Sequence, residues 1–316
     1  MKIRLRPVLI LALAMILALV LEFAYYVYVN NREDPIRQVS LIVYGSDSAR
    51  WENLKQGAEL AAGDLNAEVT LITMSSEEDA MEQISLIGRE IQNGADALLI
   101  AACDAKAVGE YMEHVKPKIP YLFVESGIGN DECLAADDTE MAVSLAKTIA
   151  ENEKEWIKVA LIADHTERDS VKKRLDAIQN ADISFADEIV LWEKNEQERN
   201  KKAQFFLQRE LTEEAVDVVV ALDNSSMEEL LDATVNLNKD IKIYGIANSS
   251  KSVYYLDNRL IKSLVYQDEF SIGYLGLTEV LSGKSNVAQD TIRYEVVDHD
   301  AMYEEAYQKL LFPHVR

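Results

Sequence analysis

The chain has 316 residues, of which 48% are hydrophobic and 28% are charged, so it is long enough for two lobes and too apolar for a disordered protein. Its formal net charge of −23 repels a phosphate backbone, which argues against a nucleic-acid partner. The two cysteines and four histidines show no metal-ligand spacing, so no metal site is expected. A disulfide between Cys103 and Cys133 and two free thiols both remain open.

The amino-terminal segment has the pattern of a membrane helix. Basic residues within 1–7 precede an apolar run over 8–29, which would span about 30 Å as a helix. The tyrosines of FAYYVYV stand at its far end, where an aromatic belt would lie. The basic residues predict a cytoplasmic amino-terminus, a spacer over 30–37 and an extracytoplasmic remainder. We expect an uncleaved, single-pass anchor in the cell membrane; a cleaved signal peptide and a buried core helix are the alternatives.

Beyond this segment, short β-branched runs alternate with amphipathic stretches. In chain order, the predicted strands are 39–44, 68–73, 97–101, 121–124, 133–136, 158–163, 189–192, 216–221, 241–246, 264–267 and 291–297. The predicted helices are 51–65, 77–92, 105–116, one starting at 139, 170–179, 196–209, 225–236, 270–281 and 301–311. The strands are apolar on both faces, as parallel strands covered by helices are. This βαβ repetition predicts an α/β protein with two doubly wound parallel-sheet lobes, which would bind ligands at the carboxyl ends of their strands.

Several segments resemble a known family in their order and spacing. They are VSLIVYGSDSARWENLKQGAELAA (39–62), IQNGADALLIAACD (91–104), PYLFVES (120–126) and LVYQDEFSIGYLG (264–276). With these segments the chain resembles the type I periplasmic binding proteins, in their ribose- and galactose-binding branch. The resemblance implies a solute-binding protein without catalysis or cofactor, whose hinged lobes close on a small neutral ligand, a sugar such as a monosaccharide. The membrane partner would be an ABC sugar importer or a sensor histidine kinase.

The resemblance also implies where the lobes divide. Lobe 1 is expected over 38–137 and 268–296, and lobe 2 over 138–267 and 297–316. The chain would cross between them near Asp137, Gln267 and Val297.

The first lobe is expected to supply aromatic and acidic ligand contacts. Trp51 matches the stacking aromatic residue of the family, although a Trp packed at a helix start has the same pattern. Asp47 and Arg50 lie in the same turn, with a helix cap and a solvated Arg as the alternatives. Glu125 and Ser126 stand where the family often has Asp-Arg, so one bidentate donor is missing.

The second lobe and the crossings supply the remaining expected contacts. Lys172 matches the family's Arg, with Arg168 as the near alternative. Asp223 and Asn224 reverse the family's Asn-Asp order, and Asn248 or Ser249 replaces an Asp that the family has at Ala247. Asp137 and Gln267 match hinge residues, and Trp192 is either a second aromatic face or a core residue. The resulting ligand-binding set is Asp47, Arg50, Trp51, Glu125, Ser126, Asp137, Lys172, Asp223, Asn248 and Gln267.

Two other classes share this kind of sheet. A dinucleotide-dependent enzyme would need a glycine fingerprint, but SLIVYGSDSAR has one glycine where three are required. A LacI-type regulator would need a basic helix-turn-helix headpiece, and this chain begins with an apolar segment instead.

Overall fold

The structure, a computed structural model, describes residues 13–23, 35–129, 133–153, 157–181, 186–194, 203–234, 237, 239, 241–283, 292–305 and 307–308. They belong to two compact units, Met1–Ile36 and Arg37–Arg316. In the first unit residues 13–23 are helical, and all of their side chains are exposed. Within the described ranges, no helix has the length and apolarity needed to cross a membrane. The predicted membrane segment extends over residues 8–12 and 24–29, which lie outside those ranges.

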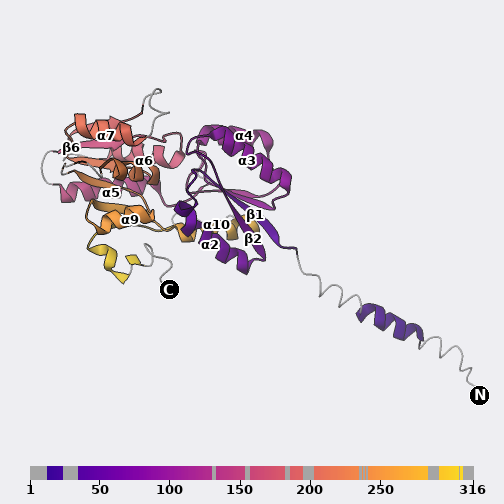
Figure 1. Cartoon of the computed structure of the whole chain (residues 1–316). Coiled ribbons are helices and arrows are strands. Elements are labelled where there is room, and N and C mark those ends of the chain that lie inside the picture. Colours follow the sequence, from indigo (N-terminus) through magenta and orange to yellow (C-terminus); the bar gives the residue numbers. More distant parts are fainter. Residues whose placement is uncertain are drawn as a thin grey trace, which may run out of the picture. The chain divides into compact units, whose positions relative to one another are not determined.

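The second unit contains two sheets (Figure 1). The first is wholly parallel in the order β2-β1-β3-β4-β5. Its strands are β1 (Arg37–Val43), β2 (Ala67–Thr73), β3 (Ala97–Ile100), β4 (Tyr121–Val124) and β5 (Cys133–Leu134). β1 and β3 are almost completely buried because helices cover both faces of the sheet.

The second sheet has the order β11-β10-β9-β8-β6-β7, and only β11 runs antiparallel to its neighbour. Its strands are β6 (Ile157–Ile162), β7 (Ala186–Trp192), β8 (Val218–Ala221), β9 (Lys242–Ile246), β10 (Ile261–Gln267) and β11 (Tyr294–Asp298). All five residues of β11 pair with β10, so this strand joins the second sheet from Tyr294 onward. This is three residues before the crossing that was expected near Val297.

Each sheet has helices on both faces. The first lobe, built on the first sheet, has α3 (Ala80–Asn93) and α4 (Ala105–Val115) on one face and α2 (Glu52–Asp64) and α10 (Glu269–Ser282) on the other (Figure 1). The second lobe has α5 (Asp138–Asn152) and α6 (Asp169–Asn180) on one face of its sheet. α7 (Ala203–Glu213), α8 (Asn224–Thr234) and α9 (Ser250–Asp257) cover the opposite face. The two-lobed, doubly wound architecture expected from the sequence is therefore confirmed.

α10 follows the second-lobe strand β10 but packs against α2 of the first lobe. Two glycines allow this contact. A Cβ at Gly57 would lie 2.0 Å from the carbonyl oxygen of Phe270, and one at Gly273 would lie 1.9 Å from that of Leu54. The backbones of α2 and α10 therefore contact each other directly. This contact packs a helix from the end of the chain against one from the start of the first lobe.

Several elements differ from their predicted limits. α9 was not predicted; it is short and begins at Ser250, with the Ser249 side chain accepting from the Ser252 amide. The carboxyl-terminal helix expected over 301–311 starts as the 3-10 turn η3 (Ala301–Tyr303). α7 begins at Ala203, whereas residues 195–202, which include most of the predicted start of this helix, lie outside the described part of the chain.

Candidate ligand-binding site

Polar side chains from both lobes meet at the carboxyl ends of the strands. Glu125 directly follows β4 and has a left-handed backbone with φ of +64°, a conformation that is costly for a residue with a Cβ. Its carboxylate accepts a 2.6 Å hydrogen bond from the hydroxyl of Tyr44, which follows β1. Its other oxygen lies 3.7 Å from the guanidinium of Arg174, on α6 of the second lobe. Burial first, and then the Glu125 charge, raises the pKa of Tyr44 well above 10, so the phenol stays protonated and donates.

Arg174, on α6 of the second lobe, is the first of two buried cations in the site, and 2% of its surface is exposed. Its Nε donates to Asp138 at 2.7 Å, and its Nη1 donates to the carbonyl of Leu222 at 2.9 Å. Burial raises the pKa of the Asp138 carboxyl to about 7, against the lowering effect of the Arg174 charge. Arg174 thus links the helix start at Asp138 with the end of β8 and with Glu125.

Arg168 is the second buried cation and is 1% exposed. Its guanidinium carbon lies 3.8 Å from the centroid of the Tyr44 ring, which places the charge over the aromatic face. Nη2 donates to the carboxylate and to the backbone carbonyl of Glu77, a residue of the loop between β2 and α3. Among the described residues, Nε and Nη1 of Arg168 have no hydrogen-bond partner. Two strong donors are therefore buried between the lobes without acceptors in the described part of the chain.

Arg50 and Trp51 form the first-lobe side of the site. The guanidinium of Arg50 pairs with Glu269 at 2.5 Å and stands 4.3 Å from the centroid of the Trp51 ring. Trp51 is 1% exposed, donates from Nε1 to the carbonyl of Tyr44 at 3.0 Å, and meets the Tyr44 ring edge-on at 4.9 Å between centroids. Protein groups therefore already cover the Trp51 ring.

Asp223 and Asn248 stand at the strand ends of the second lobe, and both are buried. Asp223 accepts from the amide and hydroxyl of Ser226 at 2.9 and 3.0 Å. Burial acts to raise the pKa of Asp223, but the charges of His165 and Arg168, together with the hydrogen bonds from Ser226, outweigh burial and lower this pKa. Asn248 is fixed by Asn224, whose side chain donates to it at 2.5 Å and accepts from its amide at 2.8 Å.

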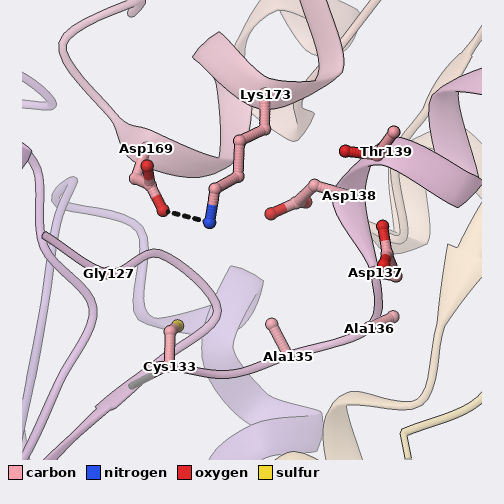
Figure 2. Close-up of a pocket in the computed structure, with 9 residues that line it drawn as sticks. All are labelled: Gly127, Cys133, Ala135, Ala136, Asp137, Asp138, Thr139, Asp169 and Lys173. Atoms are coloured by element: carbon pink, nitrogen blue, oxygen red, sulfur yellow. Dashed lines mark ion pairs between the residues drawn. The ribbon is translucent and has the colours of Figure 1, made fainter. Parts of the chain in front are cut away.

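A cavity of about 140 Å³ lies beside this network, between β5 and the starts of α5 and α6 (Figure 2). The side chains of Asp138 and Lys173 point toward each other across it, and Lys173 pairs with Asp169 at 2.8 Å. The lining residues are Gly127, Cys133, Ala135, Ala136, Asp137, Asp138, Thr139, Asp169 and Lys173. Both cysteines are buried free thiols, and burial raises the pKa of Cys103 to about 12.

The structure brings together part of the predicted set. Arg50, Trp51, Glu125, Ser126, Asp223, Asn248 and Gln267 are buried or nearly so at the strand ends. The Ser126 hydroxyl accepts from the Ser170 amide at 3.5 Å, across the lobes, and Gln267 accepts from the Ala136 amide at 3.4 Å, at the crossing.

Three predicted residues lie elsewhere. Lys172 is exposed because it occupies the solvent side of α6, whereas Arg168, its near alternative, is buried. Asp47 is exposed and caps a 3-10 turn by accepting from Ala49 at 2.9 Å, which was its alternative interpretation. Asp137 is exposed and caps α5 by accepting from Glu140 at 2.9 Å; it reaches the rim of the cavity, whereas the buried carboxylate is its neighbour Asp138.

Sequence reasoning missed five residues of the network, namely Tyr44, Glu77, Asp138, Arg174 and Glu269. A signal was available for Arg174. It stands with Ser170, Val171, Leu175 and Ile178 on the buried side of α6, and a charged residue on an apolar helix face indicates a buried ion pair. Glu77 lies in a polar loop, where its residue type carries no such signal.

The comparisons with known proteins agree with the two-lobed fold. The model of the periplasmic binding protein domain family matches residues 39–282, and the chain belongs to this family. None of the curated proteins matches the chain by sequence.

Solved structures share the fold at low sequence identity. A carbohydrate transporter solute-binding protein from Agrobacterium radiobacter, in complex with D-arabinose, has a TM-score of 0.76 at 20% identity, covering 88% of this chain and all of that one. An ABC transporter solute-binding protein from Agrobacterium vitis with bound D-fucose has a TM-score of 0.77 at 16% identity, covering 87% of this chain and all of that one. A chain of the XylFII–LytSN complex has a TM-score of 0.69 at 15% identity, covering 84% of this chain and all of that one.

Proposed function

We propose that this protein is an extracytoplasmic sugar-binding protein, which closes its two lobes on a small neutral ligand and releases it unaltered to a membrane partner. The observation that carries the proposal is Arg168. A guanidinium that is 1% exposed, with two N–H groups lacking acceptors among the described residues, is costly unless a ligand or water supplies oxygens. Sugar hydroxyls are such acceptors, and the Tyr44 ring holds the guanidinium in place for them.

The charges of the network favour an uncharged ligand. Arg50 is neutralised by Glu269, Arg174 by Asp138, and Arg168 by Glu77. Because each buried guanidinium already has a carboxylate, an anion would enter without a free positive charge to meet it. The bound arabinose and fucose of the two structural neighbours are neutral monosaccharides, which supports this ligand class. Glu125, Asp223, Asn248 and Gln267 would then bind ligand hydroxyls, with the hinge near Asp137 and Gln267.

We also propose that the amino-terminal segment anchors the domain to the membrane, with the carboxyl-terminal domain outside the cell. All side chains of residues 13–23 are exposed, and Leu13, Ile16 and Phe23 among them are apolar. A lipid bilayer is the environment that covers an apolar helix on every side. A membrane-fixed binding protein suits a fixed partner, either an ABC permease or a sensor histidine kinase. One structural neighbour was solved as part of a complex of two proteins, XylFII and LytSN, which supports a protein partner.

A thermal-shift screen of the full-length protein in detergent tests the ligand class. Neutral monosaccharides, among them D-arabinose, D-fucose and D-galactose, would be compared with a phosphate and with a dinucleotide. A sugar at 100 times its Kd should stabilise the protein by about 2.7 kcal/mol. Arg168→Gln should abolish the shift, whereas Lys172→Gln, four residues away and exposed, should keep it. Stabilisation by the dinucleotide alone, or an equal loss in both variants, would contradict the proposal.

Crosslinking in membranes tests the partner. Recovery of permease subunits alone would end the sensor version of the proposal, and recovery of a histidine kinase alone would end the importer version.

A further inference from the structure

Glu77 differs from the other carboxylates that neutralise buried guanidiniums. Glu269 and Asp138 belong to the first turns of α10 and α5, and less than a tenth of either side chain is exposed. Glu77 lies in the loop between β2 and α3, and 34% of its side chain is exposed. Glu77 is therefore a partly solvent-exposed residue of the first lobe that pairs with a buried guanidinium of the second lobe.

The loop holds Glu77 in a fixed position. The Met74 amide donates to the Gly45 carbonyl at 3.0 Å, and the Gly45 amide donates to the Ser76 carbonyl at 3.2 Å. The carboxylate of Glu77 lies over the bare backbone of Gly45, where a Cβ would come within 2.2 Å of its Oε1. The Glu77 carboxylate thus packs against the backbone of Gly45, in the turn after β1 and next to Tyr44.

The other acids near Arg168 are committed to other groups. Asp223 accepts from Ser226, and Glu125 accepts from Tyr44. The negative charges of Asp223 and Glu125 both stabilise the charged form of Arg168 from a distance. Among the described residues, however, only Glu77 forms an ion pair with it. Removal of the Glu77 charge would leave a buried cation with reduced compensation, which attracts an anion.

We propose that Glu77 is a specificity-determining residue of the site: by occupying one edge of the Arg168 guanidinium, it makes the site select neutral sugars over sugar acids. The inference rests on the proposed function for the ligand class. The Arg168 Nε and Nη1 groups remain for ligand hydroxyls, while a ligand carboxylate would face the Glu77 carboxylate beside the same guanidinium. Glu77→Gln keeps the size of the side chain and removes the repulsion, so it should admit sugar acids.

The test measures Kd values of two matched pairs, D-galactose with D-galacturonate and D-glucose with D-glucuronate. It uses the full-length protein in detergent, with thermal shift as the first readout and calorimetry for the Kd. The wild-type protein should prefer the neutral member of a pair, and Glu77→Gln should shift the ratio of the two Kd values toward the acid by about tenfold or more. Glu78→Gln is the matched control, because it removes the same charge from the adjacent residue, which pairs with His165 instead.

Each outcome decides the proposal. A wild-type protein that binds galacturonate as tightly as galactose overturns it without any variant. An unchanged ratio in Glu77→Gln, or an equal change in Glu78→Gln, also overturns it, and if Glu77→Gln does not fold, Glu77→Ser is read by the same criteria. Neutral-sugar binding without an acid gain rejects the role of Glu77 and leaves the sugar-binding function standing. An acid gain in a protein that binds no neutral sugar rejects the neutral-sugar function and, with it, the selection of neutral sugars over acids. No response in any protein also rejects both.

Discussion

The imidazole Nδ1 of His165, on the second lobe, lies 2.9 Å from a carboxylate oxygen of Glu78, on the first. Burial and the Arg168 charge act against protonation of His165, but Glu78, Asp223 and Glu77 outweigh them and raise its pKa above 6.5. The hydrogen bond from His165 lowers the pKa of Glu78 to about 2. The contact is therefore an ion pair below pH 6.5, and both of its members titrate.

The pair predicts a pH window of stability. The pKa of Glu78 is lowered from 4.5, so its contribution is present above pH 4.5 and is lost as the pH falls toward about 2. The pKa of His165 is raised, so its contribution is present below pH 6.5 and is lost as the pH rises through the folded-state value. Glu78→Gln should flatten both limbs of the plot of melting temperature against pH, whereas Glu110→Gln, exposed on α4, should not. Superimposed curves for wild type and Glu78→Gln would contradict this.

Trp51→Ala should lower the free energy of unfolding by about 3 to 5 kcal/mol, because it removes a fully buried aromatic side chain. Trp51→Phe keeps most of the packing and loses the hydrogen bond to the Tyr44 carbonyl, so it should cost about 1 to 3 kcal/mol. Urea unfolding measures both values. If Trp51→Ala kept its stability and lost only the sugar response, the ring would stack on ligand instead of packing in the core.

Above pH 7, where the Asp138 carboxyl is ionised, Arg174→Met should destabilise the protein by about 3 to 5 kcal/mol, because it leaves this carboxylate buried without its cation. The double variant with Asp138→Asn removes both charges and should recover much of the loss. A double-mutant cycle by urea unfolding gives the coupling between the two residues. Additive single effects would show that the pair contributes nothing as a pair.

Gly45→Ala should cost more stability than Gly94→Ala. Both residues have a positive φ, +77° and +88°, so alanine strains the backbone at each by about 1 kcal/mol. Gly94 has open space around it, but a Cβ at Gly45 would collide with Glu77. The excess cost should disappear when Gly45→Ala is made together with Glu77→Ser, as measured by urea unfolding. An excess that persists in this background would place the steric conflict elsewhere.

Local sequence patterns predicted much of the architecture. The strands 121–124 and 97–101 and the helix 105–116 agree with β4, β3 and α4 to within a residue, because their apolar runs and caps are local features. α9 escaped prediction because it is only eight residues long, too short for an apolar period to repeat more than twice. The family motif favours Lys172 over Arg168 because a motif match fixes a position along the chain, whereas burial depends on which side of α6 faces the first lobe.

The sequence by itself therefore determined the order of the strands and of the helices other than α9, the two-lobed α/β class, and the strand ends at which polar groups gather. These follow from hydrophobic period and helix caps, which act over a few residues. Only the tertiary structure decided which charges meet. Arg168 and Glu77 are 91 residues apart and Arg50 and Glu269 are 219 apart, and each pair forms because sheet order and lobe packing bring separate strand ends together. No local pattern encodes such a meeting, because it depends on the position of every element between the two partners.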